Sequence, residues 1–122
     1  WTHISADVPS ADETLYPKGP VKSGGLIDHL LADYGNMFAD LSAGSGLGGL
    51  TRDEDFAAGF LDRHSKKLMF ATDCPCFDGK GAESTRGVCF AQLSLPFLER
   101  LVKDEDALAD ILHNNAVRIL EL

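Results

Sequence analysis

The sequence predicts an α/β fold in which parallel strands alternate with helices. A short apolar run, Leu68–Thr72, follows polar residues and stops at Asp73 and Pro75. Such a run is typical of a strand that is buried on both faces, as in parallel sheets. A second apolar run, Met37–Leu41, lies upstream, and an amphipathic segment separates the two. The order strand, helix, strand spans one β/α unit of a barrel or a doubly wound sheet.

The first two elements are expected in residues 1–34. Residues 1–24 hold several prolines and glycines and no sustained period, which predicts a long surface excursion. A helix is predicted over Gly25–Tyr34, where the apolar residues fall on one face. Gly35 is expected to end this helix in the left-handed conformation.

A glycine-rich loop is predicted between the first strand and the next helix, over Ser42–Leu50. Thr51 and Glu54 match a capping box, which predicts that a helix starts at about Arg52. This helix is expected to carry one apolar stripe as far as His64, before the buried strand.

Beyond Asp73 the sequence predicts a flexible loop, a weak third strand at Val88–Ala91, and two helices. Ser94 is expected to cap a helix over Leu95–Val102, and Asp104 to cap a last helix that ends near Leu120. Asn114 and Asn115 are expected to interrupt that helix briefly. A sheet of only the two strands Met37–Leu41 and Leu68–Thr72 would leave its edges uncovered, which points to the C-terminal part of a larger α/β protein.

The net charge of the chain disfavours two classes of partner. The 122 residues carry eleven basic and nineteen acidic side chains, and the formal charge is −8. This charge disfavours nucleic acid and anionic membranes as partners. No apolar run approaches the roughly 18–20 residues of a membrane-spanning helix. The three cysteines are an odd number, and the N-terminal residues do not have the basic-then-apolar pattern of a signal segment. A cytoplasmic location is therefore expected.

The glycine loop offers one candidate site. Gly44–Gly49 matches G-x-G-x-x-G after a strand, and Asp73 follows the next strand, as in dinucleotide-binding proteins. The capping box would put the helix start beyond the third glycine, and Asp40 is an unusual neighbour for a pyrophosphate. A mobile loop on the substrate face is therefore preferred, and a dinucleotide-binding module is the alternative.

Asp73 and the cysteines are the other candidates. Asp73 could supply a hard oxygen to a divalent cation, or it could only cap a helix or close a loop. Cys74, Cys76 and Cys89 could bind a thiophilic metal, but zinc ligands usually come in pairs two to four residues apart. Buried or loop cysteines are therefore preferred. Of the histidines, only His3 is expected near a site.

Three segments together resemble the tail of the amidohydrolase-related family of metal-dependent hydrolases. They occur in that family's order over residues 25–122, and they are Asn36–Gly44, Leu68–Pro75 and Ile111–Leu120. The resemblance implies a (β/α)₈ TIM-like barrel, of which this chain would hold the last two strands and their helices. One departure is Ala71, where the family usually has glycine.

The resemblance also implies a function. At the position of Asp73 the family has an aspartate that binds the metal and helps to activate the attacking water. The implied cofactor is a divalent cation, with zinc first and manganese, iron or nickel as alternatives. The implied substrate is a small molecule with an amide, ester or lactone bond, and small acids are decarboxylated on the same kind of site. Ser42 and Arg52 are the expected substrate contacts, and a homo-oligomer is allowed. The remaining ligands would precede Trp1, so the chain alone is expected to be inactive.

Overall fold

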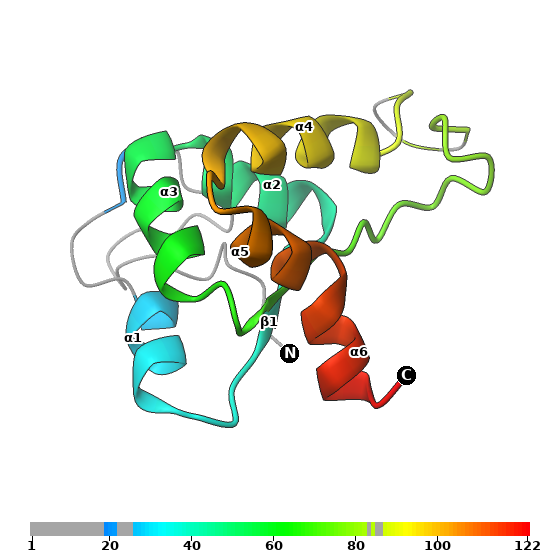
Figure 1. The fold of residues 1–122 in the computed structure, drawn as a ribbon. Coiled ribbons are helices and arrows are strands. Elements are labelled where there is room, and N and C mark those ends of the chain that lie inside the picture. Colours follow the sequence, from blue (N-terminus) through cyan, green and yellow to red (C-terminus); the bar gives the residue numbers. More distant parts are fainter. Residues whose placement is uncertain (1–18, 22–25, 83, 85–86) are drawn as a thin grey trace.

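The computed structural model describes residues 19–21, 26–82, 84 and 87–122 (Figure 1). The excursion expected over residues 1–24 lies almost entirely outside this part. In chain order, the elements of the described residues are α1 (Leu26–Asp33), β1 (Ala39–Asp40), α2 (Ala43–Thr51), α3 (Glu54–Arg63), β2 (Leu68–Met69), α4 (Ala91–Leu101), α5 (Glu105–Ala109), the π-helical turn η2 (Asp110–Asn114) and α6 (Asn115–Leu120).

The two strands form a parallel pair, so the predicted α/β class is confirmed for the described residues. Ala39 pairs with Leu68, and Asp40 pairs with Met69. Backbone hydrogen bonds extend the pairing at both ends, including one from Ala43 N to Thr72 O of 3.0 Å. Helices α2 and α3 make the crossover between the strands. The barrel stays a prediction, because a closed barrel of this kind needs eight strands.

Both strands are shorter than predicted, and the outer edge of β2 explains part of the difference. The Phe70 backbone N–H donates to the Ile111 carbonyl in η2, 2.7 Å away, rather than to another strand. The Asn115 side chain donates to the Leu68 carbonyl at 2.8 Å and also to the Ser65 carbonyl. The C-terminal helices therefore cover this edge, as native proteins commonly do with exposed strand edges.

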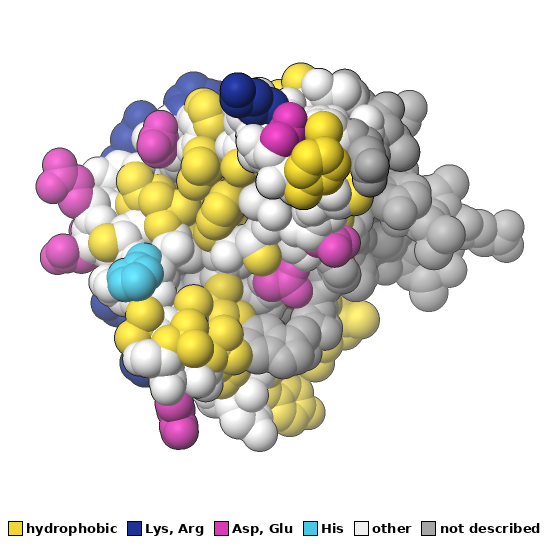
Figure 2. Space-filling view, turned by 90° about the vertical axis from the view of Figure 1, so that its right-hand side faces the viewer, with side chains coloured by type: hydrophobic (Ala, Val, Ile, Leu, Met, Phe, Trp, Pro, Cys, Tyr) yellow, Lys and Arg dark blue, Asp and Glu magenta, His cyan; other side chains and the backbone are white. Residues whose placement is uncertain are grey.

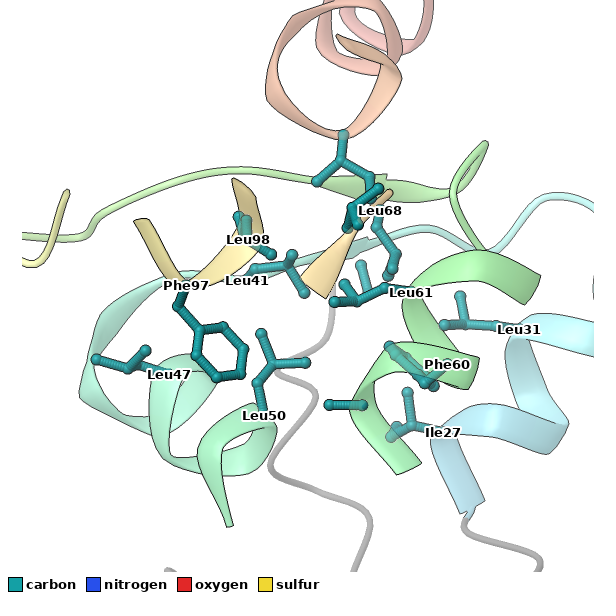
Figure 3. Packing of buried hydrophobic residues seen from close by; sticks show 14 residues of the cluster. Ile27, Leu31, Leu41, Leu47, Leu50, Phe60, Leu61, Leu68, Phe97 and Leu98 are labelled. Carbon is teal, nitrogen blue, oxygen red and sulfur yellow. The ribbon is translucent and has the colours of Figure 1, made fainter. Parts of the chain in front are cut away.

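The core lies between the strand pair and the helices that flank it (Figure 3). Ile27 and Leu31 of α1 are spaced i, i+4, so they lie on one helix face, and they pack towards Phe60 of α3. At the other end of the core, Leu50 of α2 lies beside Phe97 of α4. The apolar stripes predicted for Gly25–Tyr34 and for the helix that ends near His64 are thus confirmed in α1 and α3, where they face this core.

The predicted glycine loop is wrong, because residues Ala43–Thr51 form helix α2. Gly46 is buried, and a β-carbon at this position would lie 2.5 Å from the Leu41 carbonyl oxygen. Glycine therefore lets the helix lie directly on the chain that leaves β1. Burial of Leu47 and Leu50 on the same helix stabilises it against the low helix propensity of its glycines.

The predicted capping box is also wrong. Asp53 is the N-cap of α3, and its carboxylate accepts a hydrogen bond from the Phe56 N–H. The same carboxylate accepts from the Val21 N–H. These two donors hold the pKa of Asp53 below its usual value. Thr51 instead ends α2, where its hydroxyl donates to the Leu47 carbonyl.

Three further expectations need correction. Gly35 does not have a positive φ angle, so α1 does not end in a left-handed glycine. Val88–Ala91 is not a strand, because helix α4 starts at Ala91. Ser94 is therefore inside α4, where its hydroxyl donates to the Phe90 carbonyl. The predicted Asp104 cap is confirmed, since its carboxylate accepts from the Ala107 N–H.

The surface of the described part combines charge with apolar patches. Figure 2 shows apolar side chains gathered on one face, with acidic and basic side chains around them. Six large apolar residues are exposed, namely Leu26, Tyr34, Phe77, Leu93, Leu120 and Leu122. No helix among the described residues is long and apolar enough to cross a bilayer. The predicted homo-oligomer stays a prediction.

Candidate functional site

The carboxyl ends of β1 and β2 lie side by side, and two of the predicted site residues, Ser42 and Asp73, follow them. Ala43 follows β1 and donates its N–H to Thr72, which follows β2. Ala43 has a φ angle of 61° and Asp73 a φ angle of 45°, both in the left-handed region. Residues other than glycine adopt this region rarely, and such strain often accompanies functional sites. The chain therefore makes a sharp turn at the end of each strand.

Asp73 is exposed at this edge, where its side chain is available to a ligand. In the part of the chain that the structure describes, no trio of acidic, histidine or cysteine ligand atoms includes Asp73. Asp73 thus offers a single hard oxygen ligand, which fits one position around a divalent cation but does not complete its shell.

The two predicted substrate contacts are separated by α2. Ser42 lies at the strand edge, where its N–H donates to Asp40 Oδ1 at 3.0 Å, but Ser42 is only 6% exposed. Arg52 follows the last residue of α2. A helix of nine residues is roughly 13 Å long at 1.5 Å per residue, so Arg52 lies far from Ser42. The structure does not bring the two residues together.

A cluster of three thiols lies directly beyond Asp73. Their sulfur atoms, on Cys74, Cys76 and Cys89, all lie within 4.8 Å of one another. The Cys74 and Cys76 sulfurs are 2.9 Å apart and share a hydrogen bond. The three cysteines are free and buried or half-buried, as preferred from the sequence, and their convergence also leaves room for a shared metal ion. The usual spacing of zinc ligands does not predict this cluster, because its third member, Cys89, lies at the other end of a loop.

Close backbone contacts bring the two ends of this loop together. Asp78 Oδ1 accepts hydrogen bonds from the N–H groups of Lys80, Gly81 and Ala82. Gly81 has a φ angle of 111°, and a β-carbon there would lie 2.4 Å from the Val88 Cα. This approach, which only glycine permits, places the chain before Cys89 against the chain after Cys76.

The thiols of the cluster titrate differently. A hydrogen bond with the Cys76 side chain, together with the backbone N–H groups of Cys76 and Phe90, lowers the pKa of Cys74 to about 7 against the effect of burial. The same contact with Cys74, together with burial, raises the pKa of Cys76 to about 12. Cys74 is therefore the thiol that ionises first, and thiolates are the form that reacts and binds metals.

None of the described histidines belongs to a cluster of ligand atoms at this edge. His64 is buried beside Asp28, with 2.6 Å between Nε2 and Oδ1, and Arg63 completes the ion pair. Partial burial opposes ionisation of Asp28, but the hydrogen bonds from Arg63 and His64 outweigh it and lower its pKa. This group links α1 to α3. His3 lies outside the described residues.

Comparison of the chain with protein-family models, with curated proteins and with solved structures finds no match.

Proposed function

We propose that this chain is part of a metal-dependent hydrolase similar to the amidohydrolase-related family, and that it supplies the last β/α units of a (β/α)₈ barrel. The single observation that supports this most is the position of Asp73. It lies four residues beyond the end of β2 and directly after Thr72, whose carbonyl accepts from Ala43 at the end of β1; it is exposed, and its left-handed backbone turns the chain at that point. In barrels of this type the functional groups lie at the carboxyl ends of the strands.

Asp73 would act as one oxygen ligand of a divalent cation, with zinc first and manganese, iron or nickel as alternatives. Such a cation lowers the pKa of bound water towards neutrality. The Asp73 carboxylate is also suited to accept a proton from that water. The other ligands would come from residues outside the described part, so the chain alone would not turn over substrate.

The proposed substrate is a small molecule with an amide, ester or lactone bond, and decarboxylation of a small acid is the second reaction of this class. Burial of Ser42 changes its proposed role. We assign to Ser42 the positioning of the chain at the end of β1, since its N–H donates to Asp40 and its carbonyl accepts from Gly46. Substrate would be contacted instead by exposed groups at the carboxyl ends of β1 and β2.

The dinucleotide-binding alternative has less support. Its fingerprint needs the second glycine free, so that the backbone can approach a pyrophosphate. In this chain that glycine is Gly46, which is packed against the Leu41 backbone. If NADH fluorescence shifted on titration with the chain, the alternative would replace the hydrolase proposal.

The test compares Asp73→Asn with Asp62→Asn in the full-length protein that contains this chain. Asp62 is an exposed carboxylate on α3, so its variant controls for the loss of a negative charge. Asp73→Asn should abolish hydrolysis across a panel of lactones, esters and amides, and it should lower the content of bound divalent metal. Asp62→Asn should change neither. Unchanged turnover in Asp73→Asn would refute the proposed role.

A further inference from the structure

The thiol cluster lies in the longest stretch of the described chain that has no helix or strand of its own. This stretch runs from the end of β2 to the start of α4, and it reaches away from the helices in Figure 1. Connections of this length without regular structure are uncommon and usually have a function. Phe77, which lies beside the cluster, is 80% exposed and so does not pack into the core.

Short segments without a core are commonly held by cross-links such as disulfides or metal ions. None of the three cysteines forms a disulfide. A disulfide would also join only two of them, whereas the loop brings three sulfurs together. Cys89 is buried, and Cys74 and Cys76 are half-buried, so the cluster is partly shielded from solvent. Three convergent thiols suit a single bound ion better than a pairwise bond.

We propose that Cys74, Cys76 and Cys89 together bind one soft d¹⁰ metal cation, either Zn²⁺ or Cu⁺. Thiolates prefer these ions to hard cations such as Mg²⁺ and Ca²⁺. As the ion binds, each S–H bond breaks, a sulfur–metal bond forms, and the proton passes to the solvent. The site would tie the chain after Asp73 to the start of α4.

The surroundings of Cys74 favour this assignment. Its sulfur lies 2.9 Å from the Cys76 sulfur, and the backbone N–H groups of Cys76 and Phe90 are close enough to act as donors to it. Donors of this kind orient metal-bound thiolates and offset their charge. The inference does not depend on the role proposed for Asp73, because that role needs a hard oxygen ligand and this site uses only sulfur.

The experiment uses the 122-residue chain, reduced and kept free of oxygen. Zn²⁺ is titrated against a coloured chelator, and Cu⁺ is titrated separately against a Cu⁺-specific chelator, so the two arms identify the ion. One ion should bind per chain, with release of protons into the buffer. Co²⁺ in place of Zn²⁺ should give sulfur-to-cobalt charge-transfer absorption in the near ultraviolet.

Three variants locate the site. Cys76→Ser should weaken binding by more than about 100-fold, since loss of an outer-shell partner alone costs about 10–100-fold. Phe77→Ala changes the exposed neighbour and should leave binding unchanged, as should Asp62→Asn, which removes an exposed negative charge on α3. Circular dichroism verifies that each variant is folded.

Several results would overturn the inference. The first is that neither ion binds to the unmodified chain. The second is that Cys76→Ser binds as tightly as the unmodified chain. The third is that Phe77→Ala loses affinity while Cys76→Ser does not. Absence of sulfur-to-cobalt absorption in the unmodified chain would also overturn it, and this readout does not depend on whether a variant folds.

Discussion

Helix α2 contains two glycines for which alanine substitution should have opposite effects. At Gly46 a β-carbon would lie 2.5 Å from the Leu41 carbonyl oxygen and 2.6 Å from its carbonyl carbon. Both atoms belong to the backbone beside β1, so neither can move aside as a flexible side chain would. At Gly48, which is exposed, a β-carbon would meet nothing within 4 Å.

The magnitudes follow from these contacts. Overpacking costs about 1–3 kcal/mol, and a clash with backbone belongs near the upper end of that range. Alanine in place of glycine in a helix contributes about 1 kcal/mol of stability. Gly46→Ala should therefore lower the free energy of unfolding by about 1–2 kcal/mol. Gly48→Ala has only the favourable effect and should raise it by about 0.5–1 kcal/mol.

Urea unfolding of the 122-residue chain, followed by far-ultraviolet circular dichroism, measures both effects. The slope of free energy against urea should be the same in all three proteins, so that midpoints compare directly. If both variants were stabilised, α2 would not lie against Leu41. If both were destabilised, the segment would be a loop that needs its glycines, as its composition first suggests.

Two further predictions concern the packing of the helices. Asn115→Ala should lower the free energy of unfolding by at least about 2 kcal/mol in the same urea assay. The reason is that it leaves the Leu68 and Ser65 carbonyls without their donor. A change near zero would mean that these hydrogen bonds do not hold α6 to β2. The second prediction follows from Asp28, whose pKa is lowered in the fold by Arg63 and His64 against the effect of burial. A carboxyl with a lowered pKa contributes stability that is complete above its ordinary value of 3.8 and is lost as the pH falls below that value. Thermal unfolding between pH 6 and pH 3 should therefore show a steeper loss in the unmodified chain than in Asp28→Asn, and equal slopes would contradict the ion pair.

Local patterns predicted the elements that depend on neighbours in the sequence. The apolar run at Leu68 and Met69 forms the buried strand, and the spacing of Ala57, Phe60 and Leu61 gives α3 its buried face. The Asp104 cap was predicted correctly because a side-chain cap involves residues only three apart. In each case the stabilising contact is local, or the periodicity records which face is buried.

Helix α2 could not be predicted in this way. Its glycines have low helix propensity, and they form a helix because the backbone of the first strand lies against Gly46. The extent of β2 depends likewise on distant residues, since Ile111 and Asn115 satisfy the backbone groups at its outer edge. The contacts of β2 span more than forty positions, and the contact of Gly46 is with backbone, so neither leaves a periodic signal in the sequence.

The sequence by itself determined the α/β class, the parallel order of the strands and the location of Asp73 at the end of a buried strand, because these depend on short-range hydrophobic pattern. Only the tertiary structure decided that Ser42 is buried, that Arg52 lies at the opposite end of a helix, and that three thiols converge. The physical reason is that burial and convergence depend on which segments the fold brings into contact. In the loop that carries the thiols, Gly81 has no β-carbon, and the chain at Gly81 can therefore lie against the chain at Val88.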